Sequence, residues 1–234
     1  MTMNEAPRLL ASATERVYQS IRKDVLECRW PAGERLKIRD IADELGVSPM
    51  PVRTALRRLG DEGVLIVAEN RSARVPFVTR QSFNEYLEIS IRLECLALER
   101  AAQRISQKAV AELRVRAEQM QSEIAAGNTT GYARRFNGLL MDIYRFGESQ
   151  ALVEIIESVW IKTAPPAREA FEERGVVIRL NAAIITVIDA LGAGDGIRAR
   201  DTLASVLEYA SKSINLFLDM DEDERLRPRF RKRA

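Results

Sequence analysis

The sequence predicts a mainly α-helical protein with an N-terminal winged helix-turn-helix, made of three helices plus a β-hairpin wing, and a C-terminal antiparallel all-α bundle of about six helices. Two observations support this fold class. Residues 36–58 contain two short amphipathic helical patterns joined by a Leu-Gly-Val turn, whereas the chain after residue 79 shows long helical patterns and no convincing strand. We expect domains at residues 1–78 and 79–220, followed by a charged, disordered tail at residues 221–234.

The first helix of the central motif carries a narrow apolar stripe. Ile41, Ala42 and Leu45 fall at positions i, i+1 and i+4, and Gly46 stands where a helix ends in the left-handed conformation. The next helix has a clear start at Ser48-Pro49, because serine is a good N-cap and proline suits the first helical position. A preceding helix is expected at about residues 12–28.

The second helix of the motif separates an apolar face from a basic one. Its inward positions repeat at i, i+3, i+4 and i+7 and are Val52, Ala55, Leu56 and Leu59. The opposite side holds Met50, Arg53, Thr54 and Arg57. An arginine fork can bond guanine O6 and N7 together or hold a phosphate, so this side suits the major groove of DNA. The alternative is an ordinary helical hairpin whose arginines are solvated or, for Arg57 and Arg58, paired with neighbouring carboxylates.

Two segments after the motif predict a hairpin. Residues 63–67 and 75–78 are rich in β-branched side chains, and Asn70 between them can adopt a positive φ at the tip. This hairpin completes the wing.

Residues 13–78 resemble the winged helix-turn-helix of the GntR family of bacterial transcription regulators. The matching segments are Pro31-Ala-Gly33, Leu45-Gly46-Val47-Ser48, Pro51-Val52-Arg53 and Glu62-Gly63. The resemblance implies DNA contacts by Arg39 at the start of the second helix, by Ser48 and Arg53 at the start of the third, and by the wing at Asn70 and Arg71. Pro49 and the wing tip, which lacks the usual glycine, depart from the family pattern and put the base preference in doubt.

The second half of the chain divides into helices at short breaking sequences. These are expected at residues 128–131, 147–149, 165–166, 174–175 and 192–195. Tyr86, Ile89, Leu93 and Leu96 form an apolar stripe in the first helix, and Leu203, Leu207, Ala210 and Ile214 form one in the last, so each helix has a face to bury.

Residues 82–218 are similar to the ligand-sensing helical domain, of FCD type, in the FadR-like branch of the GntR family. The matching features are Ile91-Arg-Leu-Glu94, the Phe136-Asn137 pair and Gly194-Asp195. In that branch the bundle binds an effector and forms a dimer, and effector occupancy alters the geometry of the DNA-binding heads. The resemblance therefore implies a homodimer and a small organic effector.

Most members of the branch hold a metal ion with one aspartate and three histidines. This chain contains no histidine. The corresponding positions fall on Ala133, Asn137, Ile184 and Val206, and an amide oxygen alone is a poor ligand for a transition metal. We therefore expect no cofactor and no bound metal. A minority of the branch senses fatty acyl thioesters in a metal-free bundle, so a ligand is still expected.

The expected effector site combines an apolar floor with a few polar groups. Its candidates are Ile184 and Val206 for the floor, Asn137 as a hydrogen-bonding group, and Arg92, Arg134 or Arg135 as partners of a carboxylate. The ligand would then be a carboxylic acid or an acyl compound. The alternative is a filled core with these arginines on the surface.

Composition narrows the function classes. The net charge is +2, and residues 79–223 carry 17 basic and 22 acidic side chains, so DNA affinity must come from where the N-terminal arginines stand. No membrane segment, signal sequence or catalytic constellation is recognisable, which predicts a cytoplasmic protein that is not an enzyme. The sequence therefore predicts a dimeric, effector-responsive repressor of a near-palindromic operator; the alternative is a DNA-binding structural dimer that senses no ligand.

Overall fold

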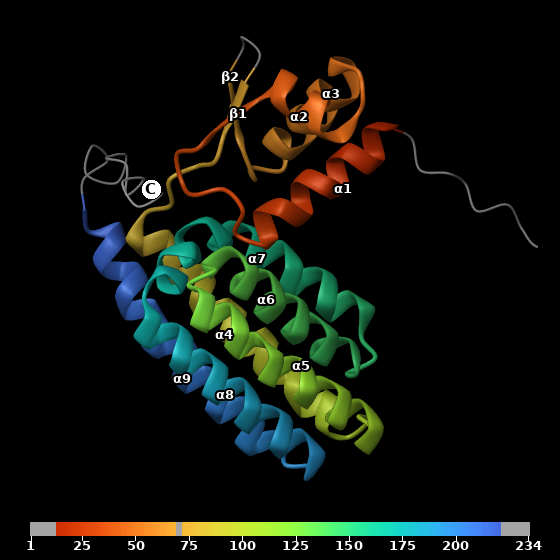
Figure 1. The fold of residues 1–234 in the computed structure, drawn as a ribbon, viewed down its shortest axis with the longest axis vertical. Coiled ribbons are helices and arrows are strands. Elements are labelled where there is room, and N and C mark those ends of the chain that lie inside the picture. Colours follow the sequence, from red (N-terminus) through yellow and green to blue (C-terminus); the bar gives the residue numbers. More distant parts are fainter. Residues whose placement is uncertain (1–12, 69–71, 221–234) are drawn as a thin grey trace, which may run out of the picture. The chain divides into compact units, whose positions relative to one another are not determined.

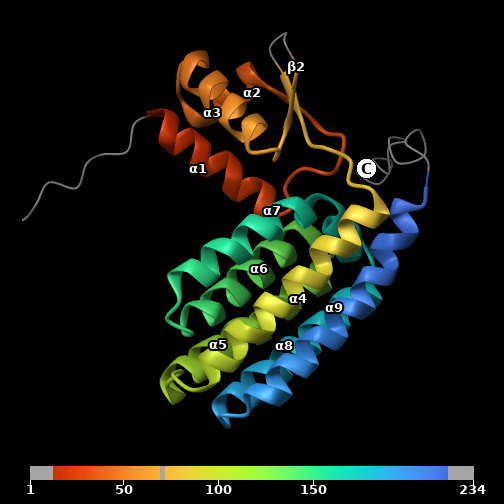
Figure 2. The same ribbon diagram turned by 180° about the vertical axis from the view of Figure 1, so that it is seen from behind.

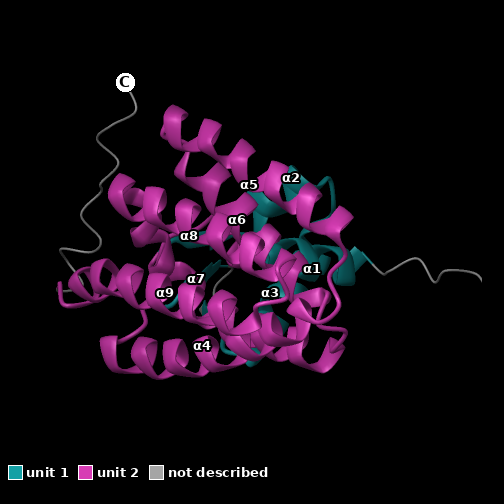
Figure 3. Ribbon diagram, turned by 90° about the horizontal axis from the view of Figure 1, so that it is seen from below, with its two compact units in different colours: residues 1–23, 34–76 teal, residues 24–33, 77–234 magenta. Residues whose placement is uncertain are grey.

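A computed structural model describes residues 13–68 and 72–220, and their arrangement is mainly helical as predicted. The chain forms two compact units, one of residues 1–23 with 34–76 and one of residues 24–33 with 77–234 (Figure 3). The boundary between residues 76 and 77 lies close to the division that we expect at residues 78–79. Residues 24–33, however, belong to the helical unit, which the division of the sequence did not anticipate.

The first unit contains the helix-turn-helix and a small sheet (Figure 1). Its elements are α1 (Ala13–Leu26, of which residues 24–26 belong to the second unit), β1 (Arg35–Lys37), α2 (Ile38–Leu45), α3 (Pro49–Asp61), β2 (Ile66–Ala68) and β3 (Ser72–Arg74). The core of this unit collects the predicted apolar stripes of α2 and α3 together with one face of α1. The order of helices and wing is therefore the one predicted from the sequence.

The turn between α2 and α3 follows the predicted chemistry. Gly46 has a φ of +62°, a left-handed conformation that glycine adopts without steric cost, and its N–H caps the end of α2. Ser48 occupies the N-cap position of α3 and Pro49 the first helical position. The Ser48 side chain makes no capping hydrogen bond, so its hydroxyl is available to another partner.

The wing differs from its predicted form. The strand expected at residues 75–78 is instead β3 at Ser72–Arg74, because Pro76 has no N–H with which to continue a ladder. β3 pairs antiparallel with β2 and also with β1, which gives a three-stranded sheet of order β1-β3-β2. The sequence prediction missed β1 because a strand of three residues is too short to show a period.

The second unit contains six helices among the residues that the structure describes, which confirms the predicted bundle (Figures 1 and 2). They are α4 (Arg80–Ala102), α5 (Gln107–Ala126), α6 (Thr129–Arg145), α7 (Gln150–Glu172), α8 (Arg174–Gly192) and α9 (Gly196–Leu218). α9 packs against α8 and α4, and α5 packs against α8 and α6. The core includes a group of aromatic rings, in which Phe136 contacts both Tyr132 and Phe171.

The predicted division into helices is wrong at two places, since one predicted break does not exist and one real break was missed. Pro165 and Pro166 lie inside α7 instead of between two helices. The break that the sequence analysis missed separates α4 from α5, where Ser106 accepts a hydrogen bond from the Ala109 N–H and so caps α5. Six helices thus result from a different division of the chain.

The buried face of α4 also differs from the predicted one. Ile89 and Leu96 of the expected stripe are 48% and 46% exposed. The side of α4 that faces the core instead carries Ser90, Glu94 and Ala97, together with the larger Phe83 and Leu98. Small residues allow the neighbouring helices to approach closely, and the buried carboxyl group is stabilised by hydrogen bonds, so the positions with the largest apolar side chains do not mark the core. The stripe predicted on α9, in contrast, is mostly buried.

α8 is long and apolar enough to span a membrane by length and composition, which makes it the one such helix in the described part of the chain. Half of the apolar window is buried within the protein, where Leu180, Ile184 and Ile188 pack in the bundle. A core helix passes the same composition test, so this helix is only weak evidence for a membrane span.

Candidate functional site

The candidate DNA-reading surface is the outer face of α3. Val52, Ala55, Leu56 and Leu59 hold the helix in the core with exposed fractions of 2% or less. The four residues predicted for the opposite side, Met50, Arg53, Thr54 and Arg57, are all exposed. The core contacts therefore fix which face of α3 is presented to solvent.

Three exposed arginines of α2 and α3 have no polar partner among residues 13–68 and 72–220. Arg39, Arg53 and Arg57 are exposed and form no ion pair or side-chain hydrogen bond with any residue that the structure describes. Thr54 is different, because its hydroxyl donates to the Met50 carbonyl at 3.2 Å. Three unpaired guanidinium groups are available to phosphates or base edges at no cost in intramolecular contacts.

Arg58, on the same helix, has a structural role. Its guanidinium pairs with Glu15 at 2.8 Å and with Glu62 at 3.1 Å, and lies over the Tyr18 ring at 3.7 Å from the centroid. The Tyr18 hydroxyl donates to Glu62 at 2.8 Å, and burial raises the pKa of Tyr18. Arg58 therefore connects α3 to α1, and the paired state that the sequence analysis left open for it is the one observed.

The wing adds basic residues that the sequence analysis did not name. Arg35 of β1 lies directly opposite Arg74 of β3, and both are exposed. Two guanidinium groups at a cross-strand pair place positive charge on the wing, where a polyanion such as DNA can bind. Recognition of β1 in the sequence would have revealed the pair. Asn70 and Arg71, predicted for the wing tip, lie outside the described residues.

A cavity of about 100 Å³ lies inside the helical unit. Its wall is mainly apolar and aromatic, with side chains from α4, α6, α7, α8 and α9 and two from residues 24–33. Four of its lining residues are polar, namely Ser90, Glu94, Asn137 and Thr163. Apolar walls with a few polar groups are typical of small-molecule sites.

Glu94 is the ionisable carboxyl group of this wall and is only 2% exposed. Its Oε1 accepts hydrogen bonds from the Ser90 hydroxyl at 2.5 Å and from the Trp160 Nε1–H at 2.9 Å, and its Oε2 accepts one from the Tyr144 hydroxyl at 2.5 Å. Burial raises the pKa of Glu94 above its usual range, and the hydrogen bonds from these three donors offset only part of that rise. Among the described residues, no lysine or arginine pairs with Glu94 or lines the cavity.

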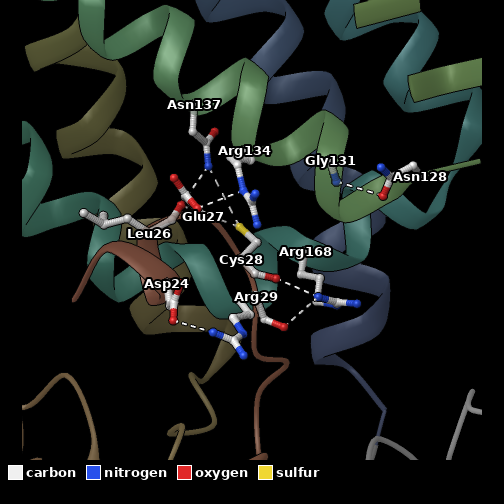
Figure 4. A network of polar contacts seen from close by, with 10 residues as sticks. All are labelled: Asp24, Leu26, Glu27, Cys28, Arg29, Asn128, Gly131, Arg134, Asn137 and Arg168. Atoms are coloured by element: carbon white, nitrogen blue, oxygen red, sulfur yellow. Dashed lines mark hydrogen bonds and ion pairs between the residues drawn. The ribbon is translucent and has the colours of Figure 1, made fainter. Parts of the chain in front are cut away.

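Residues 24–33, which we call the linker segment, contribute two side chains to the cavity wall and make polar contacts with the bundle (Figure 4). The Leu26 and Cys28 side chains line the cavity, and the bundle binds their backbone. Asn137 Nδ2 donates to the Leu26 carbonyl at 2.9 Å, and Arg168 donates to the carbonyls of Cys28 at 2.7 Å and Arg29 at 3.1 Å. Together these hydrogen bonds fasten the linker segment to α6 and α7.

Further contacts tighten the same attachment. The Cys28 thiol donates to the Ala164 carbonyl at 3.2 Å, and Arg134 pairs with Glu27 at 3.0 Å (Figure 4). Cys28 has a φ of +57°, a conformation that costs a non-glycine residue about 1 kcal/mol or more. The contacts of the linker segment with the bundle offset that cost.

The predicted effector residues separate into two groups. Asn137 lines the cavity, whereas Ile184 and Val206 are buried in the core and do not belong to the lining. The arginines proposed for a carboxylate are occupied on the surface, with Arg92 paired to Glu88, Arg134 to Glu27 and Arg135 to Glu123.

The sequence analysis did not identify Glu94, Trp160 or the linker segment as parts of the cavity. A signal was present for Glu94, since Ala97, Leu98 and Ala101 follow it at i+3, i+4 and i+7 and place the carboxyl group on an apolar face.

The residues at the four family metal positions do not fit a metal ion. Ala133, Ile184 and Val206 have no donor atom, and the Asn137 amide is engaged with the Leu26 carbonyl. No group of three or more His, Cys, Asp or Glu side chains with suitable geometry occurs within residues 13–68 and 72–220.

Comparison with protein families matches residues 13–75 to the bacterial regulatory proteins of the gntR family and residues 85–209 to the FCD domain. Similar proteins include the HTH-type transcriptional regulator McbR of Escherichia coli, 29% identical over 140 residues, which cover 60% of this chain and 63% of McbR. Transcriptional regulator YdhC of Bacillus subtilis is 27% identical over 146 residues, which cover 61% of this chain and 64% of YdhC. Each match thus spans slightly less than two thirds of the relative.

Solved structures share the fold. E. coli McbR/YncC superposes with a TM-score of 0.81 at 24% identity and covers 88% of this chain and 99% of that one. A GntR regulator from Rhodococcus sp. RHA1 superposes with a TM-score of 0.67 at 23% identity, over 87% and 98% of the two chains. At this level of identity the likeness concerns the fold alone.

Proposed function

Because the chain belongs to the GntR family of DNA-binding transcription regulators and carries an FCD domain, we propose that it is an effector-responsive dimeric repressor that acts in the cytoplasm on a short, near-palindromic operator. In this proposal the outer face of α3 reads the DNA and the cavity of the helical unit receives a small organic molecule. The protein has no enzymatic activity.

The linker segment is the observation that carries the effector response. Leu26 and Cys28 form part of the cavity wall, and the same segment is covalently continuous with α1 on one side and β1 on the other. A ligand that changes the position of this wall must therefore act on the chain that enters and leaves the DNA-binding unit. The cavity and the DNA-binding unit are coupled if occupancy changes how firmly the bundle holds the linker segment.

The exposed stripe of α4 supports the dimer. Tyr86, Ile89, Leu93 and Leu96 repeat along one side of this helix, and Ile89 and Leu96 are half exposed. A stripe of this kind can pair with its own copy across a two-fold axis. A two-fold dimer presents two α3 helices to DNA, and it therefore requires an operator with two related half-sites.

Footprinting tests the DNA-binding part of the proposal. The operator is first selected from genomic fragments by binding to the full-length protein, and the protein is then footprinted on it. We expect protection of a short near-palindrome in the presence of excess competitor DNA. Unspecific or asymmetric protection would contradict it.

Substitutions that loosen the linker segment test the effector response without knowledge of the ligand. Asn137→Ala and Arg168→Ala each remove hydrogen bonds to this segment, although neither residue belongs to the DNA-binding unit. For a repressor released by its effector, we expect operator affinity to fall at least about fivefold, the lower end of ordinary allosteric couplings. Arg145→Ala is the matched control, because Arg145 is an exposed arginine of α6 that pairs with Asp142.

The second candidate function is a DNA-binding structural dimer that senses no ligand. In that protein the linker segment is a passive connection. Asn137→Ala and Arg168→Ala would then leave operator affinity equal to that of the Arg145→Ala control, provided that all variants melt as folded proteins.

A further inference from the structure

We propose that the cavity binds an apolar organic amine in its ammonium form, with Glu94 as the group that recognises it. The inference rests on the proposed function, since it names the ligand class of the same cavity. It differs from the expectation drawn from the sequence, which favoured a carboxylic acid or an acyl compound.

The described lining of the cavity contains an acidic group and no basic one. Glu94 is the ionisable carboxyl group of the lining, and no basic residue among the described lining residues balances it. A carboxylate ligand would therefore find no opposite charge in the described lining, and it would disfavour ionisation of Glu94. An ammonium group would instead supply the missing opposite charge.

The hydrogen bonds of Glu94 leave room for one more donor. A carboxylate has about four acceptor positions, and three are filled by Ser90, Trp160 and Tyr144. The two bonds on Oε1 leave the remaining position on Oε2. Glu94 lines the cavity, and in this proposal a ligand N–H donates to the remaining acceptor position.

The three donors also orient the carboxyl group. Ser90 lies one turn before Glu94 on α4, while Tyr144 and Trp160 come from α6 and α7. Burial raises the pKa of Glu94 despite these bonds, and a bound ammonium group would favour its charged form. The carboxyl group is held in one geometry before the ligand binds, which lowers the ordering cost of binding.

The rest of the wall suits an apolar body and tolerates a cation. Phe136, Trp160 and Phe171 contribute aromatic rings to the lining, and alkyl side chains fill most of the remainder. The faces of aromatic rings attract ammonium groups, and this attraction is strongest where water is excluded. A cavity of about 100 Å³ limits the ligand to a small molecule such as an amine with one ring.

A matched set of three small probes tests the charge requirement on the full-length protein. Benzylamine, benzyl alcohol and benzoate share the same ring and differ in the charge of the polar group. We expect benzylamine to raise the melting temperature in a saturable manner at fixed pH and ionic strength, and benzoate to leave it unchanged. Calorimetric titration then gives the dissociation constants.

Glu94→Gln keeps the shape of the side chain, removes its charge and replaces one acceptor oxygen by an NH2 donor. It should weaken benzylamine binding at least about 30-fold, as expected when one partner of a buried charge pair is lost. Glu88→Gln is the matched control, because it makes the same change at an exposed residue of α4 that pairs with Arg92. The control should bind benzylamine as the unmodified protein does.

The inference is overturned if benzylamine fails to bind, if benzoate binds as well as benzylamine, or if Glu94→Gln binds benzylamine with unchanged affinity. The unmodified protein alone decides the first two outcomes, so the test does not depend on the stability of the variant. These outcomes leave the proposed function intact, since Asn137→Ala and Arg168→Ala test the coupling to DNA independently of any ligand. If the unmodified protein binds benzylamine but Asn137→Ala and Arg168→Ala leave operator affinity unchanged, the proposed function is contradicted and the ligand class is not.

Discussion

Replacement of Arg53 by alanine separates DNA recognition from folding more clearly than any other change in α3. Arg53 is exposed and forms no ion pair or side-chain hydrogen bond within the described residues, so its loss should alter the free energy of unfolding by no more than about 0.5 kcal/mol. An arginine that bonds a base edge contributes about 1–3 kcal/mol to discrimination. A dimer loses this contribution twice, which corresponds to about 2–6 kcal/mol or an operator complex weaker by about 30-fold to about 20,000-fold.

The assay is a titration of labelled operator at one fixed salt concentration, repeated with a scrambled sequence of the same length. Arg53→Ala should lower operator affinity far more than scrambled-sequence affinity, because a base contact carries sequence information and a phosphate contact does not. Arg92→Ala is the control, since it removes an exposed positive charge from the helical unit. Unchanged operator affinity for Arg53→Ala would show that α3 is not inserted in the groove as proposed.

Three further predictions concern other parts of the protein. Arg39→Ala should weaken binding to all sequences about equally and reduce the dependence of affinity on salt, as measured in the same titration at several salt concentrations. The purified protein should contain no stoichiometric transition metal by elemental analysis, and a chelator should alter neither its melting temperature nor its DNA binding, because Ala133, Ile184 and Val206 lack donor atoms. Burial raises the pKa of Cys28 to about 12 and that of Cys95 to about 11, so both thiols should react slowly with a disulfide reagent at pH 8 and rapidly once urea unfolds the chain; fast reaction of the folded protein would contradict this.

The DNA-binding unit was predictable because its signals are local. Gly46 and the Ser48-Pro49 pair fix the turn within four residues, and the apolar period of α3 fixes its buried face. The wing was less predictable, because the pairing of β1 with β3 joins residues that are far apart in sequence. Strands of three residues offer no period from which that pairing could be read.

Helix boundaries in the bundle depend on competition between local signals and packing. Pro165 and Pro166 predict a break, yet α7 continues through them because the side chains on either side of the pair are buried in the bundle. Ser106 is the better signal, since it caps α5, but a single serine is weak evidence in a long polar sequence. Burial in the bundle therefore outweighs the two prolines in α7, whereas the weaker signal of Ser106 marks a real helix start.

The cavity was only partly predictable for a related reason. Hydrophobic periodicity depends on large apolar side chains, so it predicts Ile89 and Leu96 in the core of α4. It does not identify Ser90 and Glu94, which are buried. The carboxyl group can be buried because donors from α6 and α7 reach it, and these partners lie 50 and 66 residues away in sequence. The sequence also does not show that Arg92 and Arg134 are paired with Glu88 and Glu27, and for this reason it predicts that these arginines bind a ligand.

Asn137 belongs to both the cavity wall and the attachment of the linker segment. The resemblance to the FCD-type domain implies a metal-binding histidine at this position, but the Asn137 amide donates to the backbone of the linker segment and its side chain lines the cavity. A metal ion would hold an effector from within the bundle, whereas a hydrogen bond to Leu26 connects the cavity wall directly to the end of α1. Polar contacts to the linker segment would thus allow a ligand that is not held by a metal to control the DNA-binding unit, and the ammonium ligand proposed for Glu94 needs no metal for its recognition.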